Sequence, residues 1–168
     1  IDWSAVAADG ITFAMIKCGG GDDGLYEDRK FQQNIQGALA NGIQVGVYFY
    51  SGASNAREAY DEASYCISLI RDYQITYPVA FDWELDGDYD SVTEACETFC
   101  NVISSYGYQP MVYSNRNRWY NNFDGEKIAS KYKVWMAAYF GKFYYDSVRW
   151  TYGDDLPNFR YHYDMWQY

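Results

Sequence analysis

Two carboxylates two positions apart, Asp82 and Glu84, are the residues of this sequence with the clearest chemical potential. They end the apolar run Val79-Ala80-Phe81, which is typical of a buried strand. Side chains alternate along a strand, so both acids would face one side, roughly 7 Å apart at ~3.3 Å per residue. Burial disfavours unpaired carboxylates, and two that lie close together raise the pKa of one of them. A protonated and an ionised carboxyl group side by side can cleave a glycosidic bond. A structural ion pair is the alternative.

Aromatic and amide side chains follow the other apolar runs. Functional groups of parallel α/β folds gather at the carboxyl ends of strands. Tyrosine and tryptophan combine an apolar face with a polar edge, which suits sugar rings. Lys17 ends the first run, where it would either pair with a carboxylate of the cleft or cap the strand. The candidate substrate-binding residues at these ends are Tyr48, Tyr50, Tyr113, Asn115, Tyr139, Trp166 and Gln167.

Three further motifs give weaker evidence of function than the acid pair. The loop 86–91 partly fits a calcium loop, but Ser91 stands where glycine is needed, so a solvated loop entering a helix is favoured. The glycine-rich stretch 19–24 lacks the Lys-Ser/Thr pair of a phosphate loop and indicates a flexible turn. His162, between two tyrosines, is expected at the surface or in packing. We therefore expect no metal and no cofactor.

The elements that must position these side chains alternate between strands and helices. Stripes of apolar residues at helical spacing predict helices near 31–39, 59–70 and 92–103. Ser91 and Glu94 would form a capping box on the third, and glycines at 42 and 107 would end the first and third. Alternation of this kind predicts a parallel sheet, open or closed into a barrel. The expected strands are the nearly continuous apolar runs 11–17, 43–50, 77–84, 109–114 and 133–140, with a strand-like piece at 164–168.

Composition narrows the class of protein. The chain has 168 residues, enough for one domain, and 21% of them are aromatic, including 20 tyrosines. A net charge of −10 disfavours nucleic acid and anionic membrane surfaces as partners, and no apolar run is long enough to span a bilayer. The first residues carry no export signal. The four cysteines, without a zinc-binding spacing, are expected to be buried free thiols: Cys18, Cys66, Cys96 and Cys100.

In their order along the chain, these segments resemble glycoside hydrolase family 25, the muramidase lysozymes of phages, bacteria and fungi. The acidic strand Pro78–Glu84 is one of the matching segments, and Cys18-Gly19-Gly20-Gly21 departs from the family, which has Ala-Thr-Glu-Gly after its lysine. The family also carries one active-site Asp in a strand before the Asp-Trp element and another beyond Trp-Gln-Tyr, so we expect trimming at both ends. The other matching segments are 1–6, 10–13, 16–17, the helix with Asp28, Phe31, Asn34, Ala38 and Gly42, and then 45–49, 112–115 and 166–168.

This resemblance implies an α/β fold over residues 1–168: a single-domain, modified TIM-like barrel of five β/α units with extra strands. It implies a glycoside hydrolase that cleaves the β-1,4 bond between N-acetylmuramic acid and N-acetylglucosamine in peptidoglycan, outside the cell or in the cell wall, as a monomer. Glu84 would be the general acid. Asp82 would orient the substrate's N-acetyl group or stabilise charge. Tyr48, Tyr113, Tyr139 and Trp166 would form the sugar-binding walls.

Two alternatives stay open. One is a non-catalytic glycan-binding module on the same barrel, suggested by the absent flanking acids. The other is a chitinase-like glycosidase of family 18, which also carries Asp-x-Glu on a barrel strand.

Overall fold

The computed structural model describes residues 1–139, 143–145, 150–152 and 158–168. Its centre is a seven-stranded sheet in the order β2-β1-β3-β4-β5-β6-β9, beside a hairpin of β7 and β8. Every neighbouring pair in the large sheet is parallel except β1 and β2. The strands are β1 (Phe13–Gly20), β2 (Tyr26–Glu27), β3 (Gln44–Tyr50), β4 (Val79–Asp82), β5 (Pro110–Asn115), β6 (Lys133–Ala137), β7 (Phe143–Tyr145), β8 (Trp150–Tyr152) and β9 (Met165–Gln167).

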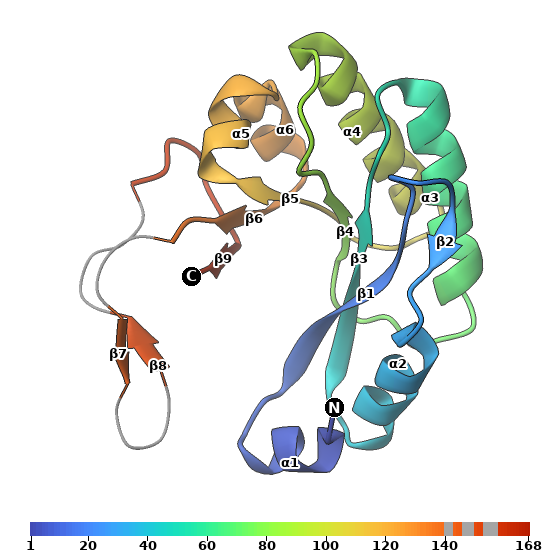
Figure 1. Cartoon of the computed structure of the whole chain (residues 1–168), viewed down its shortest axis with the longest axis vertical. Helices are drawn as coiled ribbons and strands as arrows, with labels where there is room; N and C mark the ends of the chain where they lie inside the picture. Colours follow the sequence, from blue (N-terminus) through green and yellow to red (C-terminus); the bar gives the residue numbers. More distant parts are fainter. Residues whose placement is uncertain (140–142, 146–149, 153–157) are drawn as a thin grey trace.

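Helices cover the outer side of the sheet, which is curled into a half-barrel (Figure 1). This arrangement confirms the predicted α/β fold of alternating strands and helices. No helix formed by the described residues is both long and apolar enough to cross a membrane. The helices are α1 (Trp3–Ala8), α2 (Phe31–Ala40), α3 (Ala56–Ile70), α4 (Tyr89–Ser105), α5 (Arg116–Asn121) and α6 (Gly125–Lys131).

The hydrophobic core lies between the sheet and these helices. Phe49 of β3 and Phe81 of β4 both contact Phe99 of α4, with ring centroids 6.1 and 5.2 Å apart. All four cysteines belong to this core as buried free thiols, as predicted. Since alternate strand residues fill the core, the residues between them are left to face the concave side of the sheet.

The ends of α2 and α4 test the predicted helix caps and stops. Gly42 and Gly107 follow α2 and α4 with φ of +74° and +85°, so both predicted stops are confirmed. The predicted capping box at Ser91 is wrong. The cap is Asp88, whose carboxylate accepts from the Ser91 amide at 3.1 Å and from its hydroxyl at 2.9 Å. This side chain satisfies one of the first free amides of the helix, and α4 begins at Tyr89.

The glycine-rich stretch 19–24, predicted as a flexible turn, is a turn only in its second half, where Gly24 has a φ of +80°. Gly19 and Gly20 continue β1 and pair with Glu27 and Tyr26 of β2. A Cβ atom at Gly19 would lie 2.2 Å from the main-chain oxygen of Tyr26. The missing side chains therefore let β2 lie close against β1.

Candidate active site

Asp82 is the last residue of β4 and is held at the carboxyl end of the sheet by both neighbouring strands. The Ser51 amide, just beyond β3, donates to the Asp82 carbonyl at 2.7 Å. On the other side, the Ser114 hydroxyl of β5 donates to the Trp83 carbonyl at 2.7 Å. Both serines are fully buried. These contacts fix the main chain on which the two acids stand.

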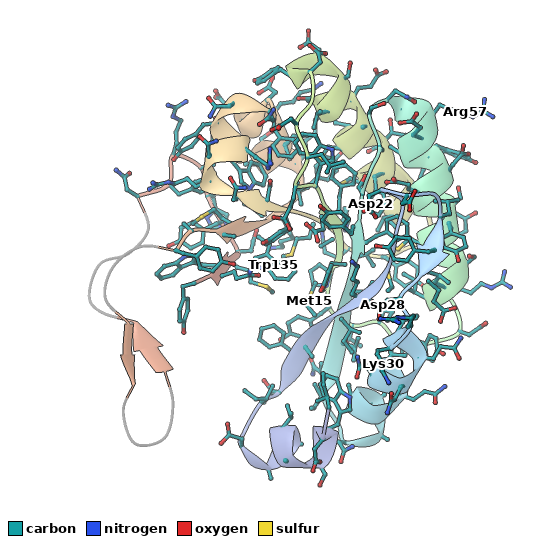
Figure 2. The ribbon with its side chains drawn as sticks, viewed as in Figure 1. Met15, Asp22, Asp28, Lys30, Arg57 and Trp135 are labelled. Atoms are coloured by element: carbon teal, nitrogen blue, oxygen red, sulfur yellow. The ribbon has the colours of Figure 1, made fainter. Side chains whose placement is uncertain are left out.

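Asp82 and Glu84 open into the same cavity, as expected, but the predicted strand 77–84 ends at Asp82, so Glu84 lies in the segment just beyond β4. The cavity has a volume of about 400 Å³. Trp135 lies edge-on to Tyr48 and Tyr113 in its wall, with ring centroids 6.1 and 4.7 Å away. Figure 2 labels Met15 on β1 and Trp135 on β6, which contribute from different parts of the curled sheet. The described residues that line the cavity are Met15, Tyr48, Asp82, Glu84, Tyr113, Trp135 and Gln167.

The two acids differ in their surroundings. Asp82 is 4% exposed, and its Oδ1 has no hydrogen-bond partner among the described residues. Burial, and secondarily the negative charge of Glu84, raises the pKa of Asp82 from its ordinary value of 3.8 to about 8, while Lys17 opposes this shift. Glu84 is half-buried at the cavity. At neutral pH the free site therefore holds a proton on Asp82.

Lys17 acts on this site from β1. Its ammonium group lies over the ring of Tyr50 at 5.0 Å and over that of Tyr26 at 5.6 Å. Its charge lowers the pKa of Asp82. Neither expected role is seen as such: among the described residues Lys17 forms no ion pair with a cleft carboxylate, and it acts on Asp82 only through its charge, at a distance.

Four of the predicted substrate-binding residues gather around the acids. Tyr48, Tyr113 and Gln167 line the cavity. Burial raises the pKa of both lining tyrosines, so each remains a neutral hydroxyl. Tyr50 pairs with Asp82 in the sheet; burial raises its pKa, and Glu84 and Asp82 add to the shift.

Tyr50 and the other three predicted residues lie outside the cavity lining. The Asn115 side chain caps α5 by accepting from the Arg118 amide at 3.1 Å. Trp166 precedes Gln167 in β9, so strand alternation turns it to the opposite face, where its indole N–H donates to the Ala138 carbonyl at 3.1 Å. Tyr139 is 64% exposed, and its hydroxyl accepts a hydrogen bond from Gln167.

Met15 and Trp135 line the cavity but were not predicted. Met15 pairs with Gly46 of β3, and Trp135 with Tyr113 of β5, so both share a sheet face with the predicted residues. Counting every second residue back from Lys17 and from Tyr139 would have found them.

Comparison with curated proteins returns cell-wall-lytic enzymes. The chain is 30% identical over 100 residues to a lysozyme of Streptococcus phage Cp-1, covering 56% of this chain and 29% of that protein. It is 26% identical over 145 residues to an autolytic lysozyme of Clostridium acetobutylicum, covering 83% and 41%. It also matches a D-alanyl-L-alanine endopeptidase of Streptococcus phage B30, with 33% identity over 56% of this chain. The chain spans 22% to 41% of the length of these relatives.

Solved structures share the fold. The modular autolysin LytC from Streptococcus pneumoniae, in complex with a synthetic peptidoglycan ligand, aligns with a TM-score of 0.78 at 25% identity, covering 99% of this chain and 39% of that one. A family 25 glycosyl hydrolase from Bacillus anthracis aligns with a TM-score of 0.77 at 18% identity, covering 100% and 73%. The profile of the family described as "Glycosyl hydrolases family 25" matches residues 1–168. The chain therefore belongs to glycosyl hydrolase family 25.

Proposed function

We propose that this chain is a peptidoglycan hydrolase that cleaves the β-1,4 bond between N-acetylmuramic acid and N-acetylglucosamine. Glu84 is the general acid and Asp82 the assisting carboxyl group. The observation that carries the proposal is that both acids open into one aromatic-walled cavity, in a chain of glycosyl hydrolase family 25. The LytC structure with a synthetic peptidoglycan ligand supports the choice of substrate.

Binding of the glycan explains how the proton reaches the leaving oxygen. In the free protein Asp82 holds a proton up to about pH 8. A sugar that fills the cavity removes water from Glu84, which disfavours the charged form of that carboxyl group. An acetamide N–H of the substrate would at the same time donate to Asp82 and favour its ionised form. The proton then resides on Glu84, which donates it to the glycosidic oxygen as the bond to the anomeric carbon breaks. A water molecule then adds its oxygen to the anomeric carbon and returns a proton to the Glu84 carboxylate.

The cavity wall suits a saccharide. Its volume of about 400 Å³ lies within the usual range for small-molecule sites, roughly 300–1,000 Å³. Tyr48, Tyr113 and Trp135 offer ring faces and edges for the apolar side of a sugar. The Gln167 amide, which donates to Tyr113 Oη at 3.4 Å, can turn to a sugar hydroxyl. All the described residues that line the cavity belong to one chain, and we propose that the protein acts on the cell wall as a monomer.

Product analysis tests this function. Purified cell walls are digested with the protein, and the soluble fragments are reduced and identified by mass spectrometry. The proposal predicts fragments that end in a reducible N-acetylmuramic acid. Fragments ending in N-acetylglucosamine would point to a different bond, and cleavage of chitin oligomers alone would favour the chitinase-like alternative. Saccharide binding without any product would favour the glycan-binding module.

A further inference from the structure

A second buried carboxyl group, Glu62 of α3, has no part in the proposed chemistry at the end of β4. It is 3% exposed. Its Oε2 accepts a hydrogen bond from the Ser51 hydroxyl at 2.5 Å, and its Oε1 accepts from the Gly52 amide at 2.9 Å. Burial raises the pKa of Glu62 to about 7, against the effect of both hydrogen bonds. Burial of a carboxyl group lowers the stability of the fold unless its hydrogen bonds compensate, so the two hydrogen bonds of Glu62 indicate a specific role.

The chain is shaped to admit this side chain. A Cβ atom at Gly21 would lie 2.1 Å from Glu62 Oε1, so any other residue there would collide with the carboxyl group. A Cβ atom at Gly52 would lie 2.6 Å from the Asp22 main chain. Figure 2 labels Asp22, which follows β1, and Arg57, which points outward near the start of α3. The end of β1, the loop after β3 and helix α3 thus meet at Glu62.

Ser51, which is hydrogen-bonded to Glu62, also forms a hydrogen bond to the main chain of Asp82. The Ser51 amide donates to the Asp82 carbonyl at 2.7 Å, and the Ser51 hydroxyl also accepts from the Ala53 amide at 3.1 Å. The Gly21 amide donates to the Tyr50 carbonyl at 2.9 Å, which ties β1 to the same segment. A short chain of contacts therefore runs from the Glu62 carboxyl group through Ser51 to the main chain of Asp82.

We propose that Glu62 is a positioning residue of the peptidoglycan-cleaving site, and that it fixes Ser51 and Gly52 so that the Ser51 amide holds Asp82 in its buried place. The proposal rests on the proposed function for its effect on catalysis, but not for its effect on Asp82. A displacement of about 1 Å at a catalytic group can cost about 100-fold in rate.

The test compares Glu62→Ala, Glu62→Gln and Gly21→Ala with the unchanged chain. Asp61→Asn is the matched control, because Asp61 is the neighbouring acid on α3, pairs with Arg57 and lies at the surface. Hydrogen exchange of the Ser51 amide and NMR titration of the Asp82 carboxyl carbon are measured first. Rates on soluble peptidoglycan fragments follow, at a temperature where every variant is folded.

In Glu62→Ala we expect the Ser51 amide to exchange about tenfold faster or more. We expect the Asp82 titration midpoint to fall by about one pH unit or more, because a loosened strand end admits water. We also expect kcat to fall by about 10- to 100-fold with little change in KM. Glu62→Gln keeps one of the two acceptor oxygens, so it should restore the three values in part. Gly21→Ala should reproduce the alanine effects by displacing Glu62, which provides the test if Glu62→Ala does not fold.

Unchanged Ser51 exchange and Asp82 titration in a folded Glu62→Ala or Gly21→Ala protein would overturn the proposal. So would a loss of stability without any change in kcat or in the Asp82 midpoint, because that pattern describes a merely structural residue. If the unchanged chain cleaves no peptidoglycan, the proposed function fails, while the exchange and titration data still decide the positioning role.

Discussion

Replacement of Asp82 by asparagine should stabilise the fold at neutral pH and destabilise it in acid. The unfolded chain releases the Asp82 proton near pH 4, whereas the folded chain holds it to about pH 8. Between these values the unfolded state binds fewer protons, so the free energy of unfolding falls as pH rises. The fall is about 1.4 kcal/mol per pH unit, or about 4 kcal/mol from pH 4 to 7. This is an upper limit, because water in the open cavity eases ionisation.

The asparagine introduced by Asp82→Asn does not ionise, so the variant lacks this pH-dependent loss. Instead, its free energy of unfolding is lowered by about 1–3 kcal/mol at every pH. The reason is that the buried position of Asp82 Oδ1 offers no hydrogen-bond partner among the described residues to the new amide group. The variant should therefore be the less stable protein at pH 4 and the more stable one at pH 7.

Urea unfolding at pH 4, 5.5 and 7 measures the difference directly. Asp86→Asn is the matched control, because the Asp86 side chain is 98% exposed, and its difference from the unchanged chain should not follow the same trend. Parallel stability profiles for Asp82→Asn and the unchanged chain would refute the reasoning, since they would mean that Asp82 titrates alike in both states.

Three further outcomes can be checked. Trp135→Ala should weaken saccharide binding by about tenfold through loss of an aromatic wall, as titration calorimetry would show; unchanged affinity would place the sugar elsewhere. Glu62→Gln should remove a loss of up to about 3 kcal/mol that the unchanged chain suffers as pH rises from 4.5 to 7, since burial raises the pKa of Glu62; equal slopes in denaturation would contradict this. Asn55→Ala should cost about 1 kcal/mol of unfolding free energy, because Asn55 caps α3 by accepting from the Glu58 amide; a change below a few tenths would argue against the cap.

The strands and the acid pair could be predicted because their signals are local. Continuous apolar runs mark strands that are covered on both faces, and the spacing of Asp82 and Glu84 at the end of such a run predicted that both would lie on one side. His162 was expected at the surface or in packing, and it lies 79% exposed beside Asp164. These features depend on a few neighbouring residues, which the sequence displays directly.

The features that were missed depend on contacts between distant segments. A run of glycines at 19 to 21 predicts a flexible turn when only neighbouring residues are considered. In the structure, the absence of side chains there makes room for Tyr26 and Glu62. Asn115 looks like a cleft residue by position, but its side chain caps the helix that follows. Trp166 and Gln167 could not both line the cavity, and this error was avoidable, since neighbours in a strand face opposite sides.

The most direct test of the proposed chemistry is the rate of peptidoglycan cleavage by Glu84→Gln, beside Glu94→Gln as an exposed control on α4. Glutamine keeps the shape of the side chain but cannot give up a proton to the leaving oxygen. We predict a loss of about 10²–10⁴ in kcat for Glu84→Gln and little change for Glu94→Gln. Cleavage by a folded Glu84→Gln protein at the rate of the unchanged chain would contradict the role of Glu84 as general acid.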